Sequence, residues 1–241
     1  MEMERKILLK ARTGSHNYNL ATPESDEDYK VFVAPTFEEM YNGKTYAKSI
    51  VTDTVDQDIH DIRKLPELLF KSNIAYSEVL FSEKIYFNAM LNEVLELRDE
   101  IMKINLPQLW KSCGGMFLNR MKKLDKGTDG TQHLVDRYGY NTKEALHMYR
   151  TLLIPVEFEA NGFKDFESVL RYNDTDRQNM LDIKNGIFTR EEFIAFITNY
   201  EKYAFKPLKD KYCSQPVNHE LKARLDEIVM ELVEAHITGR C

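Results

Sequence analysis

Two aspartates follow a glycine–serine pair near the start of the chain. Gly14 and Ser15 come directly after an apolar segment, and Asp26 and Asp28 begin the next one. Side chains two residues apart in a strand share a face, so these carboxylates would repel each other unless a cation lay between them. Mg²⁺ is commonly held by one or two carboxylates together with substrate phosphates. The spacing predicts a metal-assisted phosphoryl-transfer site, with the Ser15 hydroxyl and nearby backbone amides contacting phosphate oxygens.

A third carboxylate is expected from the segment 55–62, which reads VDQDIHDI. Asp56, Asp58 and His60 alternate, so they share one face of a predicted strand. Either aspartate could complete the site, because carboxylates from two neighbouring strands can hold two ions about 3.5–4 Å apart. Each feature alone is ordinary, since Gly-Ser is a common turn and alternating acids often line a solvated strand. Their order along the chain favours the metal site.

A basic stripe lies in a predicted helix over Thr142–Phe158. Lys143, His147 and Arg150 occupy positions i, i+4 and i+7 and therefore share one stripe of that helix. Such a row suits a triphosphate or an RNA backbone, because guanidinium groups bind phosphate through paired hydrogen bonds. A solvated basic face, or a stripe that pairs with acids elsewhere in the protein, explains the spacing equally well.

The hydrophobic pattern changes near residue 85. Before it, short apolar runs predict the strands Lys6–Arg12, Tyr29–Ala34, Ser49–Thr54 and Val55–Ile62. Short helices are predicted at Thr36–Tyr41 and Leu65–Lys71, and Ala75–Phe81 fits a strand or a helix. After it, the helical period predicts Met90–Ile104, Leu106–Leu124, Thr142–Phe158 with a bend or a break at Pro155, Phe163–Leu170, Thr175–Lys184, Thr189–Lys206 and Val217–Ile237. We expect a small mixed α/β (α+β) sheet domain over 1–85 and a helical bundle over 86–241.

The composition is that of an ordinary globular protein. The 241 residues are 43% hydrophobic and 30% charged, with 33 Lys and Arg against 39 Asp and Glu. The net charge of −6 makes a general surface for duplex DNA unexpected. Cys113, Cys213 and Cys241 are odd in number and far apart, which favours a reducing compartment. No apolar run approaches the roughly 20 residues that span a bilayer, so we expect a cytoplasmic protein without a membrane partner.

The segment 14–30, GSHNYNLATPESDEDYK, resembles the G-S…D-x-D motif of the DNA polymerase β nucleotidyltransferase superfamily. Within that superfamily it is similar to a bacterial and phage family of predicted nucleotidyltransferases, some linked to RNA repair, with the pattern G-S-x-x-Y-x-L-x-T-x-x-S-D-x-D. The segment 58–81 is similar to the same family, as is the K-x-x-x-H-x-x-R spacing of the basic stripe. The resemblance implies a nucleotidyltransferase catalytic domain followed by a helical substrate- and nucleotide-binding domain.

The resemblance also implies an activity and a set of site residues. A nucleoside triphosphate such as ATP would be the donor, Mg²⁺ or Mn²⁺ the cofactor, and a hydroxyl the acceptor of the nucleoside monophosphate. The implied nucleotide-binding residues are Gly14, Ser15, Lys143, His147 and Arg150. Asp26, Asp28 and Asp56 would bind the metal and act in catalysis, and Asp58 fits the third position nearly as well.

Three functions are compatible with these patterns. The first is a metal-dependent nucleotidyltransferase that releases pyrophosphate, with an RNA end, a protein or a small molecule as acceptor. The second is a non-catalytic nucleotide- or RNA-binding protein on the same fold. The third is a toxin–antitoxin or phage-defence interaction protein that acts only with a partner. The intact Gly14-Ser15 pair and the surplus of acids favour the enzyme. The acceptor, the preferred nucleotide and the oligomeric state stay open.

Overall fold

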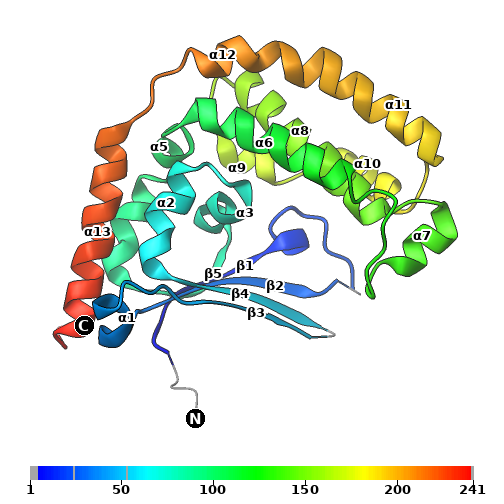
Figure 1. Ribbon diagram of the computed structural model, residues 1–241. Helices are drawn as coiled ribbons and strands as arrows, with labels where there is room; N and C mark the ends of the chain where they lie inside the picture. The colour runs from blue at the N-terminus through cyan, green and yellow to red at the C-terminus, as the bar shows by residue number, and fades with distance from the viewer. Residues whose placement is uncertain (1–4, 24, 53, 240–241) are drawn as a thin grey trace. The chain divides into compact units, whose positions relative to one another are not determined.

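The computed structural model describes residues 5–23, 25–52 and 54–239 (Figure 1). Contacts divide the chain into two compact units, of which one combines Met1–Asn105 with Val217–Cys241 and the other is Leu106–Pro216. This division differs from the boundary expected near residue 85. The segment 86–105 and the last helix of the chain both belong to the sheet-containing unit.

Among the described residues, five strands form one sheet in the first unit, in the order β3-β4-β2-β1-β5. The strands are β1 (Ile7–Thr13), β2 (Glu27–Val33), β3 (Ala47–Val51), β4 (Val55–Asp61) and β5 (Glu83–Phe87). β2 and β4 are parallel, and the other neighbouring strands are antiparallel. The small mixed sheet predicted from the sequence is therefore confirmed, although β5 was not among the expected strands.

Short helices accompany the sheet in this unit. They are α1 (Phe37–Tyr41), α2 (Leu65–Phe70), α3 (Ile74–Ser77), α4 (Asn92–Glu96) and α5 (Arg98–Met102). α2 and α3 lie over one face of the sheet (Figure 1). Phe32 of β2 is buried on that face, where the centre of its ring lies 6.5 Å from that of Tyr76 in α3. The segment 75–81 is helical, formed by the end of α3 and the 3-10 turn η3 (Glu78–Phe81), so the open choice between strand and helix is settled as helix.

The last helix, α13 (His219–Ile237), packs in the first unit although it follows the whole helical segment. Its apolar stripe is buried, with Leu225 and Leu232 at most 1% exposed. Arg224 donates two hydrogen bonds to the Glu93 carboxylate, at 2.7 and 2.6 Å. Burial of this stripe supplies most of the packing energy, because an exposed ion pair contributes only about 0–1 kcal/mol.

Helices make up the second unit. They are α6 (Leu106–Met121), α7 (Gln132–Tyr138), α8 (Thr142–Ala160), α9 (Phe166–Leu170), α10 (Asp174–Lys184), α11 (Arg190–Tyr200) and α12 (Lys209–Cys213). This is the helical region expected for the second part of the chain. α8 continues through Pro155, where a bend or a break was considered, and Pro155 itself is buried. The Tyr212 hydroxyl donates to the Pro155 carbonyl oxygen at 2.7 Å.

Two other features bear on the sequence-based expectations. Cys113 is buried and Cys213 is exposed, both as thiols, whereas Cys241 lies outside the described residues. Within the described part of the chain, no helix is both long enough and apolar enough to cross a bilayer.

Candidate active site

The two strands that carry the acidic motifs are parallel neighbours. Asp28 is the second residue of β2, and it pairs in register with Asp56, the second residue of β4. Paired residues of adjacent strands project from the same face of a sheet. Asp28 and Asp56 therefore lie side by side at one end of the sheet, and both are partly exposed.

Gly14 lies directly against the Asp28 carboxylate. It begins the 3-10 turn η1 (Gly14–His16) with a φ of +67°, in the left-handed region that favours glycine. A Cβ atom at this position would lie 2.0 Å from Asp28 Oδ2 and 2.9 Å from Asp28 Cβ. Only glycine lets the backbone of the Gly-Ser turn approach the acid this closely. The glycine expected beside the acidic motif is thus in physical contact with it.

Backbone hydrogen bonds fold the segment after Gly14 back on itself. The Asn17 amide donates to the Gly14 carbonyl at 3.0 Å, and the Leu20 amide donates to the Ser15 carbonyl at 2.9 Å. Tyr18 and Leu20 are each only 3% exposed, so they anchor the loop in the core. Ser15 itself is partly exposed, so the anchored turn places this residue at the protein surface.

Asp26 precedes β2 and is exposed. The turn before it is closed by two hydrogen bonds of 2.9 Å, from the Ser25 amide to the Thr22 carbonyl and from the Thr22 amide to Ser25 Oγ. Among the residues that the structure describes, no three acidic, histidine or cysteine side chains gather into a metal-binding group. The sheet register pairs two of the predicted ligands, Asp28 and Asp56. Asp26 lies one residue before the start of β2 and is outside this pairing.

Asp58, the alternative third acid, is surrounded by hydrogen-bond donors. Lys30, its register partner on β2, donates from Nζ to Asp58 Oδ2 at 2.7 Å. The Tyr76 hydroxyl donates to the same oxygen at 3.2 Å. His60 Nε2 lies 2.9 Å from the other oxygen, Asp58 Oδ1. Both carboxylate oxygens are therefore occupied by neighbouring side chains.

The electrostatics of this group follow from its contacts. The hydrogen bond with His60, followed by that with Lys30, holds the pKa of the Asp58 carboxyl far below its usual range, although partial burial opposes the shift. Burial, with the nearby Asp58 charge, raises the pKa of Tyr76 to about 12. Asp58 therefore stays ionised at neutral pH, and the Tyr76 hydroxyl keeps its proton as a donor.

The basic stripe on α8 is not evenly exposed. Lys143 is exposed and His147 is partly buried, whereas Arg150 is only 7% exposed. Burial lowers the pKa of His147 well below its usual value, and the charges of Arg120, Arg150, Lys143 and Lys184 lower it further. His147 is thus neutral at pH 7 and sits among cations. A fully solvated basic face does not describe this stripe, because its arginine is buried.

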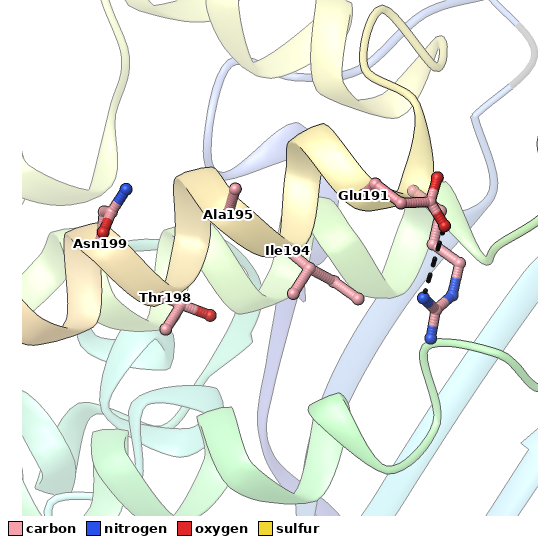
Figure 2. A pocket seen from close by; sticks show the side chains of 6 residues that line it. Glu191, Ile194, Ala195, Thr198 and Asn199 are labelled. Carbon is pink, nitrogen blue, oxygen red and sulfur yellow. Dashed lines mark ion pairs between the residues drawn. The ribbon is translucent and has the colours of Figure 1, made fainter.

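Helix α11 carries a shallow pocket of about 420 Å³, shown in Figure 2. Its lining residues are Arg190, Glu191, Ile194, Ala195, Thr198 and Asn199. Arg190 forms ion pairs with Glu191 at 3.8 Å and with Asp125 at 2.7 Å. All lining residues belong to one helix of the second unit, and none is a predicted site residue.

Two residues near the acids were not indicated by the sequence patterns. Lys30 follows Asp28 by two positions, so the strand period alone would have placed it on the same face. Tyr76 comes from α3, and no local spacing connects it with the strand residues that it contacts. Long-range packing alone brings Tyr76 to Asp58.

Comparison with known proteins identifies the family. Residues 1–231 match the RNA repair pathway DNA polymerase beta family. The chain belongs to this family. The family match spans nearly the whole chain, both units included, and it agrees with the resemblance carried by the Gly14-Ser15 and Asp26-x-Asp28 motifs. The protein is accordingly assigned, at the level of family, as nucleotidyltransferase-like.

No curated protein matches the chain. Among solved structures, the chain is similar to a nucleotidyltransferase-like protein from Exiguobacterium sibiricum 255-15, determined at 1.90 Å resolution. The two share 12% sequence identity, the similarity covers 98% of this chain and 87% of that one, and the TM-score is 0.27. At this score the family assignment depends on the sequence match.

Proposed function

We propose that this member of the RNA repair pathway DNA polymerase beta family is a metal-dependent nucleotidyltransferase. It would move a nucleoside monophosphate from a nucleoside triphosphate to a hydroxyl and release pyrophosphate. The observation that carries the proposal is the register of Asp28 with Asp56, next to a glycine whose backbone touches Asp28. Two adjacent carboxylates beside a turn that can meet phosphate oxygens are the parts such a transfer needs.

The donor set fits Mg²⁺ or Mn²⁺, which prefer oxygen ligands. Asp28 and Asp56 would hold the ion, and Asp26 would join them from the segment before β2. When bound, the metal supplies positive charge that offsets the phosphates and favours an ionised acceptor hydroxyl. We assign the third position to Asp56, since Asp58 already accepts from Lys30 and Tyr76.

The remaining predicted residues would bind the nucleotide. The amides that follow Gly14 and the Ser15 hydroxyl would donate to phosphate oxygens. Lys143 is the exposed cation of the α8 stripe and would contact a phosphate group directly, whereas Arg150 is the buried one. His147 would take part as a neutral imidazole, because burial and nearby cations lower its pKa.

An RNA hydroxyl is the acceptor to test first, since the family is described as belonging to an RNA repair pathway. The experiment incubates the purified protein with each α-³²P-labelled nucleoside triphosphate, Mg²⁺ or Mn²⁺, and cellular RNA. Parallel reactions use a protein lysate and a pool of small hydroxyl compounds. We expect label to enter one of the three acceptor classes and pyrophosphate to appear with it.

Asp28→Asn is the decisive variant, because it removes a metal-binding carboxylate while keeping the size of the side chain. We expect transfer to fall at least about 100-fold, as for the loss of a major electrostatic contribution to catalysis. Asp129→Asn, in an exposed loop of the second unit, is the matched control and should leave transfer unchanged. Nucleotide binding without transfer to any acceptor would instead support the non-catalytic binding protein. Full transfer by Asp28→Asn would refute the proposed site.

A further inference from the structure

A Lys30–Asp58 ion pair lies one row behind the Asp28–Asp56 pair on the same sheet face. The β2–β4 register runs Asp28 to Asp56 and then Lys30 to Asp58. Alternate strand residues share a face, so all four side chains project from the same side of the sheet. On β2 and β4, the first row consists of two acids, and the next combines a cation with an anion.

Lys30 is within reach of both proposed metal ligands. It stands two residues after Asp28 on β2 and diagonally opposite Asp56 on β4. Diagonal neighbours on a sheet face are about 7–8 Å apart, a distance that long side chains can cross. An unrestrained lysine ammonium would therefore compete with a metal ion for these carboxylates.

The structure holds the ammonium elsewhere. Lys30 Nζ lies 2.7 Å from Asp58 Oδ2 and 4.9 Å from the centre of the Tyr76 ring. The two charged side chains are 18% and 29% exposed, so solvent screens their interaction only in part. His60 and Tyr76 fix the Asp58 carboxylate from its other sides.

The two rows differ in net charge. The Lys30–Asp58 ion pair carries no net charge, whereas Asp28 and Asp56 are both acidic. Asp58 accepts from neighbouring donors at both oxygens, whereas Asp56 makes no side-chain hydrogen bond or ion pair with any other described residue.

We propose that Asp58 is a positioning residue that holds Lys30 away from Asp28 and Asp56 and so keeps these two carboxylates available to a divalent cation. The inference rests on the proposed function, since it presupposes a metal at Asp28 and Asp56. It assigns the two aspartates of β4 opposite tasks, with Asp56 as a metal ligand and Asp58 as the group that restrains a competing cation.

The test measures Mn²⁺ binding to the full chain by electron paramagnetic resonance of the unbound ion, at one pH and one ionic strength. The variants are Asp58→Asn, Lys30→Met and the double variant. We expect Asp58→Asn to weaken Mn²⁺ binding about tenfold, the size expected when a unit charge moves close to the ligands. The double variant should return to within about threefold of the unaltered protein, because the competing cation is gone. Lys30→Met alone should tighten binding by less than Asp58→Asn weakens it.

Control measurements separate this role from a general loss of structure. Tyr76→Phe removes one donor to Asp58 but leaves the Lys30 ion pair, so Mn²⁺ binding should change by no more than about twofold. Thermal unfolding of each variant reports whether the fold is retained. Rescue by Lys30→Met would not follow if Asp58→Asn only disrupted the sheet.

Two outcomes would overturn the inference and leave the proposed function intact. A double variant as weak as Asp58→Asn would make Asp58 itself a metal ligand. Equal and opposite effects of the two single substitutions would show that both charges act only through space. Asp28→Asn distinguishes these cases from failure of the proposed function. If that variant binds Mn²⁺ as tightly as the unaltered protein, or if neither binds it, the proposed metal site fails and the inference fails with it.

Discussion

The acidic pair on the sheet and the basic stripe on α8 differ in how evenly their members are exposed. Asp28 and Asp56 occupy the same position in two parallel strands, and both are partly exposed. Along α8, exposure falls from Lys143, which is exposed, to Arg150, which is buried. A strand register places its partners at one depth, whereas seven residues of helix advance about 10 Å past successive neighbours. Register pairing therefore gives the two acids on the sheet similar exposure, whereas spacing along one helix gives its basic residues unequal exposure.

The largest expected effect concerns the glycine that touches Asp28. Gly14→Ala should lower the free energy of unfolding by about 2–5 kcal/mol, since it combines left-handed backbone strain with a clash against a packed side chain. It should also abolish Mn²⁺ binding, because the Asp28 carboxylate must move. Urea denaturation and the Mn²⁺ measurement described above check both effects.

Gly43→Ala is the matched control for Gly14→Ala. Gly43 has a similar φ of +62°, but a Cβ atom there would meet nothing within 4 Å. In this variant the free energy of unfolding should fall only by the cost of the left-handed backbone, about 1–2 kcal/mol, and Mn²⁺ binding should be kept. Equal losses of unfolding free energy in Gly14→Ala and Gly43→Ala would mean that the contact between Gly14 and Asp28 does not contribute to stability.

The second prediction tests the uneven exposure of the α8 stripe. Arg150→Ala should lower the free energy of unfolding by about 2–3 kcal/mol, because it empties a buried position that a long side chain fills. Lys143→Ala should change the stability by less than about 0.5 kcal/mol, as expected for an exposed side chain. Chemical denaturation of both variants measures the difference.

Lys143→Ala is consequently the cleaner test of phosphate binding. Calorimetric titration with a non-hydrolysable nucleoside triphosphate and Mg²⁺ should show an affinity weaker by about 1–2 kcal/mol, because the variant cannot make the charge-assisted hydrogen bond to phosphate. If Lys143→Ala and Arg150→Ala both keep the fold and bind the nucleotide with unchanged affinity, the basic stripe is not part of the nucleotide site. The acidic pair of Asp28 and Asp56 would then be the part of the site that still has support.

The smallest effect is a pH dependence due to His147. Its pKa is lowered in the folded protein, so below the ordinary value of 6.5 the unfolded chain binds a proton that the folded chain does not. Stability should therefore fall with pH below about 6.5, by about 1 kcal/mol at one pH unit lower. His147→Gln should remove this contribution.

The check compares denaturation of the unaltered protein and His147→Gln at pH 7.5 and 5.5. Exposed His133 provides the matched variant, His133→Gln, which should retain the full acid sensitivity. An acid sensitivity that survives in His147→Gln would place its origin in another group. Such a result would also argue against a neutral His147 imidazole in the folded protein.

Local patterns in the sequence predicted much of the fold. Alternating or apolar runs located β1, β2, β3 and β4 to within a few residues, and the helical period predicted from Thr189 matches the start of α11 at Arg190. β5 was missed because its five residues are largely exposed and alternate only weakly. The return of α13 to the first unit could not be foreseen, since periodicity reveals an apolar stripe without saying what covers it.

The sequence by itself determined the family, the chemistry of the candidate groups and the face on which each strand residue projects. These follow from residue types and from spacings of two or a few residues. The tertiary structure decided which groups meet. Strand pairing set Asp56 beside Asp28 and Lys30 beside Asp58, packing of α3 brought Tyr76 to Asp58, and the helices around α8 buried Arg150. Contacts between distant segments depend on register and on which surfaces are covered, and neither is encoded in any local spacing.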